Sequence, residues 1–421
     1  MFLKAFLAWI ILYVPNQLRF PSDLGLKGLN VFNLLLLVGL VMMLVSEKSD
    51  DDRPAPLRGR IFFYFLVICI AFVLGTAQSP DYLVDDITHL KTILTYPLLY
   101  FIYYRCVRDR ATARLLLAVV MGTAFIAGVE AFRQALDYGL GSGKRVAGPF
   151  GYALASANYA GVFFAIFAPM GLSLVLFHRE RLIRLAGASV YASALIGVFY
   201  TYSRTALAAI GVTTVLLSLI RSRVLAFAVV FLIINFAVWG PETVLQRVES
   251  TTVETAQGEE KLEESTESRF YLWEGGWEML KERPYGIGLN QFHRQIEPHL
   301  PPWIIARDAH NHFVLIATEA GIQGFIALVL LCLGFYSVGF QLLRQREDRE
   351  ARALGWGYVM CVTGLIMGNL YNSLIYSGEV MGNFWILTAL MARYRDFAER
   401  EQLEAKRQVE RAELDGVDAL V

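Results

Sequence analysis

Residues 158–177 read NYAGVFFAIFAPMGLSLVLF, a run of twenty residues without a charged side chain. An α-helix rises about 1.5 Å per residue, so about twenty apolar residues cross the hydrocarbon layer of a bilayer, which is about 30 Å thick. The next residues, 178–184, contain Arg179, Arg181 and Arg184. This stretch therefore predicts a membrane-spanning helix that ends in a basic loop.

The rest of the chain has the same character. Of its 421 residues 56% are hydrophobic and only 18% are charged, and its mean hydropathy of +0.45 is too high for soluble domains. We predict an all-α, polytopic integral membrane protein with about twelve transmembrane helices. The predicted spans lie at residues 2–15, 29–46, 61–77, 91–104, 113–132, 158–177, 185–202, 205–220, 224–240, 313–341, 353–372 and 378–393.

Alternate loops are basic, and this alternation predicts the orientation. Cytoplasmic loops retain Lys and Arg during insertion. Residues 78–90 and 373–377 contain neither, so they are predicted to lie outside the cytoplasm, and both termini inside it. The basic loops are 47–60, 105–112, 178–184, 221–223 and 344–352.

This topology divides the chain into four parts: nine helices in residues 1–240, a periplasmic cap at 241–312, three helices in 313–393 and a charged cytoplasmic tail at 394–421. The cap begins with an acidic, Thr-rich section, expected to be mobile or a surface helix. It continues with Trp, Tyr, Arg, His and turn residues, which suit a folded lid over a cavity. The cap is therefore the predicted location of the chemistry.

Charge and cysteine content narrow the function. The 38 basic and 38 acidic residues give a net charge of zero. The chain therefore lacks the excess of positive charge that is typical of nucleic-acid-binding proteins. The four cysteines have no paired spacing and none lies in the cap, so we expect neither a disulfide framework nor a zinc site.

An arginine lies between the seventh and eighth predicted spans, in Ser203-Arg204-Thr205. Intramembrane charge is costly unless it faces a polar cavity or an anion. A basic residue on the translocated side also opposes the orientation bias. Function is therefore favoured over the alternative, in which Arg204 reaches the lipid headgroups.

The cap contains a second arginine, Arg269, four residues before Trp273 and hence on the same face of a helix. The planar guanidinium suits bidentate phosphate binding. An arginine stacked on Trp273 at the surface remains the alternative.

Residues 308–313 read DAHNHF before the chain re-enters the membrane. Asp308 or Asn311 could cap the following helix, and His310 or His312 could act as a base or metal ligand. Histidines two positions apart point in different directions on a helix, which argues against one shared metal ion. A hydrogen-bonded structural histidine is the alternative.

Two weaker signals complete the set of candidates. Lys144 and Arg145 open a Gly-rich loop that could bring cations to an anionic headgroup, or be an ordinary connection. Asp85, Asp86 and His89 could hold a divalent cation, although Asp also caps helices routinely.

In this order the motifs resemble the O-antigen ligase and polymerase superfamily. They are S-R-T, then R-x-x-x-W with E-R-P-x-G-I-G, then H-N-x-F with E-x-G-x-x-G, preceded by G-P-F-G and Asn158, and they cover residues 145–330. The resemblance implies an enzyme of lipopolysaccharide biosynthesis in the bacterial inner membrane, with its site on the periplasmic side. It implies inverting, metal-independent glycosyl transfer, without a cofactor, from a glycan on undecaprenyl diphosphate to lipid A-core or another glycan acceptor.

The resemblance also assigns residues. The family's two arginines fall on Arg204 and Arg269, and its histidine falls on His310, with His312 as the second choice for the base. On this hypothesis the arginines hold the diphosphate, Lys144 or Arg145 assists, and His310 activates the acceptor. The remaining residues predicted to bind the diphosphate or the glycan are Ser203, Trp273 and Asn311.

Three alternatives stay open. Twelve spans with one dominant loop resemble the ligase layout, whereas Arg145 and Gly161 have a spacing reported for polymerase loops. A ligase that glycosylates proteins is also possible. A flippase for lipid-linked sugars would need the same helices, but the two halves show none of the symmetry common in transporters.

Overall fold

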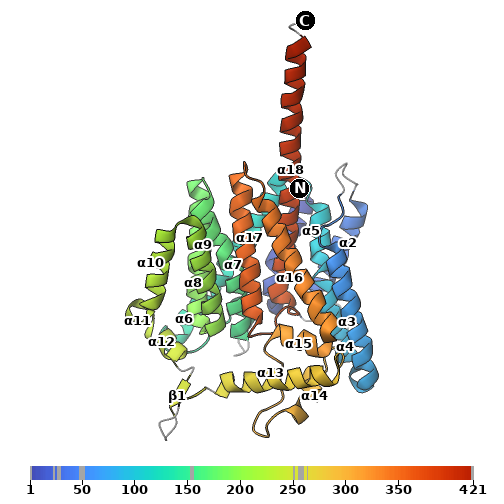
Figure 1. Cartoon of the computed structure of the whole chain (residues 1–421), viewed down its shortest axis with the longest axis vertical. Helices are drawn as coiled ribbons and strands as arrows, with labels where there is room; N and C mark the ends of the chain where they lie inside the picture. The colour runs from blue at the N-terminus through green and yellow to red at the C-terminus, as the bar shows by residue number, and fades with distance from the viewer. Residues whose placement is uncertain are drawn as a thin grey trace.

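The computed structural model describes residues 2–21, 24–25, 30–46, 53–151, 156–249, 252–254, 260–262 and 264–418. It is a helical bundle with one short β-ribbon, so the all-helical prediction is confirmed. Figure 1 shows the long helices side by side, with both ends of the chain at one end of the bundle. We call this the terminal end and the opposite end the cap end.

Every predicted span falls on a helix or on two successive helices. The helices before the cap are α1 (Phe2–Asn16), η1 (Gln17–Arg19), α2 (Val31–Val45), α3 (Arg58–Gln78), η2 (Pro80–Tyr82), α4 (Leu83–Thr95), α5 (Leu98–Cys106), α6 (Arg110–Tyr138), η3 (Gly148–Phe150), α7 (Ser156–Phe177), α8 (Arg181–Thr201), α9 (Arg204–Arg221) and α10 (Arg223–Ile234).

α11 (Phe236–Trp239) follows α10 within the ninth predicted span. The cap contains α12 (Glu242–Glu249), β1 (Thr252–Glu254), β2 (Glu260–Leu262), α13 (Glu264–Glu282), α14 (Phe292–Gln295) and η4 (Glu297–His299). The chain then forms α15 (His312–Glu319), α16 (Gly321–Leu343), α17 (Arg349–Asn369) and α18 (Gly378–Asp418).

Six helices in the described part of the chain are long and apolar enough to cross a membrane: α3, α6, α7, α8, α9 and α16. Two shorter apolar helices, α2 and α10, accompany them. Three predicted spans, 91–104, 224–240 and 313–341, each fall on two successive helices. Pro97 lies between α4 and α5, because proline has no backbone N–H with which to continue the hydrogen bonds of α4. Ala320 lies between α15 and α16, and Gly321, with a φ of +72°, begins α16.

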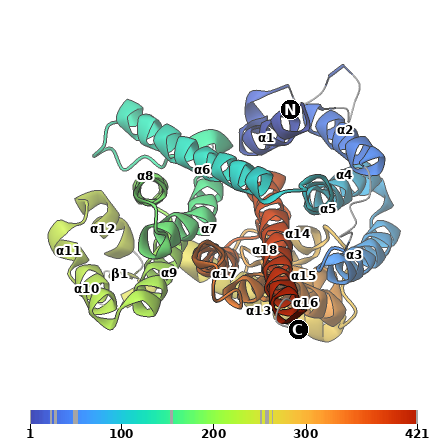
Figure 2. The same cartoon turned by 90° about the horizontal axis from the view of Figure 1, so that it is seen from above.

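The core of the bundle is aromatic and tightly packed. Phe163, Phe164 and Phe167 of α7 are fully buried, and the rings of Phe163 and Phe167 lie 4.6 Å apart. Figure 2 shows α17 and α18 near the middle of the bundle, α1–α5 on one side and α8–α12 on the other. The core therefore holds together segments far apart in the sequence.

The cap lies across one end of this bundle. Figure 1 shows α13 nearly perpendicular to the long helices and beneath α15. The acidic section before it is not the expected surface helix, because β1 and β2 pair as an antiparallel ribbon, with Thr252 opposite Leu262. Residues 255–259 of that section lie outside the described residues.

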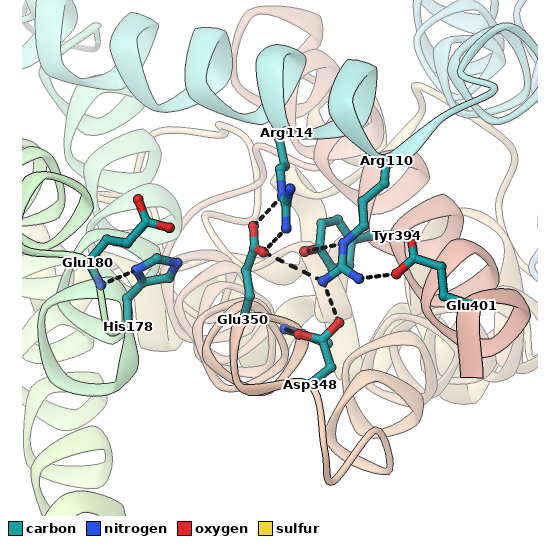
Figure 3. Close-up of polar contacts among 9 residues, drawn as sticks. Arg110, Arg114, His178, Glu180, Asp348, Glu350, Tyr394 and Glu401 are labelled. Carbon is teal, nitrogen blue, oxygen red and sulfur yellow. Dashed lines mark hydrogen bonds and ion pairs between the residues drawn. The ribbon is translucent and has the colours of Figure 1, made fainter. Parts of the chain in front are cut away.

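Charged pairs join the helices at the terminal end. Arg110 of α6 contacts Asp348, Glu350 at 3.5 Å and Glu401 at 2.5 Å, as Figure 3 shows. These partners begin α17 or belong to the last part of α18. The predicted tail is thus the continuation of α18, which runs unbroken to Asp418.

Candidate functional site

The tight turn between α8 and α9 places Arg204 at the cap end. Tyr202 has a left-handed backbone, with a φ of +49°, which is uncommon outside glycine. Ser203 is buried, and its hydroxyl accepts the Ala206 amide at 3.4 Å, so it caps α9. Arg204 is therefore the first residue of α9, where it can turn toward the cap.

Two side chains of this turn reach the cap. The Tyr202 hydroxyl donates to the hydroxyl of Thr243 in α12 at 3.0 Å. A guanidinium nitrogen of Arg204 donates to the hydroxyl of Thr266 in α13 at 3.4 Å. The predicted intramembrane arginine thus contacts the cap, and the site is shared between bundle and cap.

Arg145, in the loop between α6 and α7, is anchored against the same turn. Its guanidinium donates to the Thr201 carbonyl at 2.8 Å and to the Asn158 side-chain oxygen at 2.7 Å. Gly161 of α7 packs on Ser203, where an added Cβ would lie 3.0 Å from the serine Cβ. The structure therefore brings Arg145, Asn158 and Gly161, three residues of the sequence motifs, to the Ser-Arg turn.

Four arginines converge here. Burial, together with the charges of Arg247, Arg269 and Arg204, lowers the pKa of Arg145 to about 10. Like charges disfavour each other's charged form, so the charges of the other three arginines lie near enough to Arg145 to act on it. Their planar guanidinium groups can donate hydrogen bonds to an anion such as a phosphate.

Lys144, the neighbour of Arg145, points elsewhere. It is exposed, and its ammonium group lies 5.8 Å from the centre of the Tyr138 ring. Its charge is not one of those that shift the pKa of Arg145. The structure thus favours Arg145 of the two cations predicted in this loop.

Arg247 of α12 is the member of the cluster that the sequence reasoning missed. After burial, its charge is the largest influence on the pKa of Arg145. The sequence did contain a signal for Arg247. Basic residues are depleted on the translocated side of membrane proteins, and this argument had already singled out Arg204. Its position next to an acidic section made it look like part of a solvated segment.

Trp273 links α13 to the loop that carries the histidines. Its indole nitrogen donates to the Ala309 carbonyl at 2.8 Å, and its ring lies 5.5 Å from that of Tyr371. Arg269 precedes it by one helical turn on α13. The contact therefore brings Arg269 close to residue 310.

His310 lies at the end of this loop, next to Arg269. It is half-buried and has a left-handed backbone, with a φ of +48°. Burial lowers the pKa of His310, as do the charges of Arg269 and Arg307, while Asp308 opposes them. The Asp308 carboxylate also accepts the His310 backbone N–H at 3.3 Å. The imidazole is therefore biased toward its neutral form, which can accept a proton.

Asn311 and His312 begin α15. The Asn311 side-chain oxygen accepts the amides of Phe313 and Val314 at 3.0 and 3.3 Å, so it is the helix cap, one of the two candidates from the sequence. The His312 backbone N–H donates to the Asn372 carbonyl at 3.1 Å. Both residues fix the start of the helix.

The His312 ring is in the protein interior. It is fully buried, and its ring lies edge-on to Tyr376 at 4.4 Å. Burial, reinforced by His89, lowers the pKa of His312 to about 3. Neither ring nitrogen has a hydrogen-bond partner among the described residues. Of the two histidines, His310 is therefore the one placed beside the arginine cluster.

The acidic residues of α4 are engaged in protein contacts. The Asp86 carboxylate is buried and accepts from the Asn290 amide at 2.8 Å and pairs with Arg294 at 3.0 Å, whereas Asp85 is exposed. No group of three or more His, Cys, Asp or Glu in the described residues is arranged to hold a metal ion. Asp86 thus ties α4 to the cap.

The fold and site define a multi-pass membrane protein with cations and a histidine gathered beneath a cap at one end of a helical bundle. Residues 188–329 match the family model described as O-antigen ligase. The matched segment contains Arg204, Arg247, Arg269 and His310. The match supports the resemblance of this segment to the O-antigen ligase and polymerase superfamily, and a glycosyltransferase activity of that type. No curated protein matches the chain.

Proposed function

We propose that this protein is an inverting, metal-independent glycosyltransferase that moves a glycan from undecaprenyl diphosphate to an acceptor sugar. We place it on the ligase branch, where O-antigen is joined to lipid A-core. The observation that carries the proposal is the convergence of Arg145, Arg204, Arg247 and Arg269 beside His310.

The arginines can stabilise the leaving group, which is the lipid diphosphate. Breaking the bond between the sugar C1 and the diphosphate oxygen leaves a lipid diphosphate, and negative charge grows on its oxygens. Preorganised cations in a site poor in water stabilise such charge strongly. In this proposal Arg204 and Arg269 bind the diphosphate. Arg145 and Arg247 increase the positive electrostatic potential around it.

His310 can act as the general base for the acceptor hydroxyl. A neutral imidazole takes the proton of the acceptor hydroxyl as its oxygen attacks C1, on the face opposite to the diphosphate. The configuration at C1 is inverted, the glycosidic bond replaces the bond to diphosphate, and the proton leaves His310 to water. The lowered pKa of His310 supports this role, because it keeps the base unprotonated near neutral pH. Ser203, Asn311 and Trp273 hold the surrounding backbone in place.

We further propose that the bundle crosses the bacterial inner membrane about twelve times, with the cap in the periplasm and both termini in the cytoplasm. The structure is compatible with this topology because both termini lie at one end and α13 at the other (Figure 1). Basic loops at the terminal end support it as well: Figure 3 shows the start of α6 and the residues around His178 and Asp348 together there.

Reconstitution of the purified protein tests the proposal. A lipid-linked glycan donor is supplied with lipid A-core in one arm and with a second lipid-linked glycan in the other, without an energy source. We expect glycosylated lipid A-core in the first arm. Product in the second arm alone would assign the protein to the polymerases. Movement of the donor across the bilayer without product would assign it to transporters and contradict the proposal.

A further inference from the structure

Residues 370–377 connect α17 to α18 at the cap end, and the proposed chemistry uses none of them. We call them the α17–α18 linker. The last residue of α17, Asn369, fixes the linker to the helix. Its side-chain oxygen accepts the Leu374 backbone N–H at 2.8 Å, and its amide nitrogen donates to the Leu365 carbonyl at 2.9 Å. Asn369 is fully buried, so the linker is a firmly held part of the fold.

The α17–α18 linker contacts His312, two positions after His310, in two ways. The Asn372 carbonyl accepts the His312 backbone N–H at 3.1 Å. The Tyr376 ring lies edge-on to the His312 ring, with 4.4 Å between the ring centres. On another edge the Tyr376 ring meets His89 of α4 at 5.4 Å. The linker therefore holds His312 through both its backbone and its ring.

The same linker acts on the other side of His310 through Trp273. The Tyr371 ring lies 5.5 Å from the Trp273 ring. The Trp273 indole nitrogen in turn donates to the Ala309 carbonyl at 2.8 Å. The contacts of one short linker thus reach both flanks of His310.

His310 needs such support because its backbone is strained. Its φ of +48° lies in the left-handed region, which is unfavourable for residues other than glycine. A strained conformation persists only where the surrounding structure holds it in place. Asp308 and Asn311 make hydrogen bonds near His310, but both belong to the same loop and would move with it. The linker supplies restraint from a distant part of the chain.

We propose that the α17–α18 linker is a positioning element for His310, with Tyr376 and Tyr371 as its positioning residues. The inference rests on the proposed function, because it takes His310 to be the base that accepts the acceptor proton. Tyr376 acts through His312, and Tyr371 acts through Trp273, so neither is a catalytic residue. A base must be placed closely, since a displacement of about 1 Å can lower a rate about 100-fold.

Variants of Tyr376 test the proposal with two measurements. The chain has six histidines, so NMR of isotopically labelled histidine can follow His310, whose signal is assigned with His310→Gln. Burial and Arg269 lower the pKa of His310, so Tyr376→Ala, which frees the loop, should raise that pKa. It should also lower kcat by about 10- to 100-fold. The donor KM should stay unchanged, because the arginines that bind the donor belong to other segments. Tyr376→Phe keeps the ring and should retain all the wild-type values.

Tyr358→Ala is the matched control, because Tyr358 is fully buried in α17 and hydrogen-bonded to Thr388 of α18. It should lower the thermal unfolding midpoint and leave unchanged both the pKa of His310 and kcat per folded molecule. The inference is overturned if Tyr376→Ala leaves the pKa of His310 at its wild-type value, or if Tyr358→Ala raises that pKa equally.

Tyr371→Ala covers the case in which Tyr376→Ala does not fold, because Tyr371 is 40% exposed. It should also raise the pKa of His310, and it should lower kcat by about 2- to 10-fold, the loss expected for one aromatic pair. The NMR measurement needs no glycan transfer. The expected pKa shifts without transfer by wild type would overturn the proposed function alone. Transfer by wild type, with one pKa of His310 in all folded variants, would overturn the role of the linker alone.

Discussion

The two ends of the bundle use arginine in opposite ways. At the terminal end Arg110 and Arg114 face carboxylates: Arg110 contacts Asp348 and Glu401, and Glu350 contacts both (Figure 3). At the cap end the charges that act on Arg145 are those of other arginines. Arg145 itself binds two uncharged oxygens, and the described residues place no carboxylate on it.

The difference distinguishes cations that hold the fold from cations that can bind a ligand. A paired arginine already has its counter-charge, and removal of one partner of a buried pair destabilises the fold, by about 3–5 kcal/mol in well-buried cases. Guanidinium groups that lie near one another offer an arriving anion several charged donors at once. Substitutions at the terminal end should therefore act on stability, and those at the cap end on catalysis.

The largest difference between the two ends is expected in kcat when a histidine is replaced. His310→Ala removes the proposed base and should lower kcat by about 10²- to 10⁴-fold, the usual contribution of general base catalysis. The control is His178→Ala at the terminal end, where the imidazole accepts the Glu180 amide at 3.1 Å (Figure 3). Initial rates of transfer in detergent measure both, and equal rates for the two variants would remove His310 from the mechanism.

The next contrast is between arginines. Arg204→Ala and Arg269→Ala should each lower kcat by about 10²- to 10³-fold, as loss of one electrostatic donor does in other enzymes. Arg110→Ala should instead lower the thermal unfolding midpoint and leave the rate per folded molecule unchanged. If Arg110→Ala lowers the transfer rate per folded molecule and leaves the unfolding midpoint unchanged, the proposed difference between the two ends is wrong.

Arg247 provides a smaller test. Arg247→Gln should raise the KM for the donor about tenfold, because a hydrogen bond to a charged group contributes about 1.5–3 kcal/mol. The matched substitution at the terminal end is Arg114→Gln, whose partner is Glu350. If both variants keep the wild-type KM, Arg247 is a neighbour of the cluster without a part in binding.

The smallest effect is on the pH profile. Arg307 disfavours the protonated imidazole of His310, so Arg307→Gln should raise the pKa of His310 and move the acid limb of kcat/KM to higher pH. Asp308 acts oppositely, so Asp308→Asn should move that limb to lower pH. Shifts of the same sign in both variants would show that the limb reports another group.

The helical fold could be predicted from the sequence, and candidate site residues could be proposed from it, because both rest on local patterns. Apolar runs define the helices, and an arginine such as Arg204 stands out where the surrounding residues are apolar. The breaks at Pro97 and Gly321 follow from backbone rules at single residues, but their effect on the length of a span depends on packing.

The sequence could not predict which distant residues come together in the fold. Arg247 joins the cluster only because Tyr202 and Thr243 connect the turn to α12, a contact between residues forty-one positions apart. The burial of His312 likewise depends on Tyr376, which arrives with a later segment. Such contacts come from the tertiary fold, and one-dimensional spacing does not contain them.

Binding of a lipid diphosphate tests the central claim most directly. The affinities of farnesyl diphosphate and farnesyl monophosphate are measured by calorimetry for wild type, for the double variant Arg204→Ala, Arg269→Ala, and for Arg110→Gln as the terminal-end control. We predict that wild type and Arg110→Gln prefer the diphosphate and that the double variant loses this preference. An unchanged preference in the double variant would contradict the assignment of the arginine cluster as the diphosphate site.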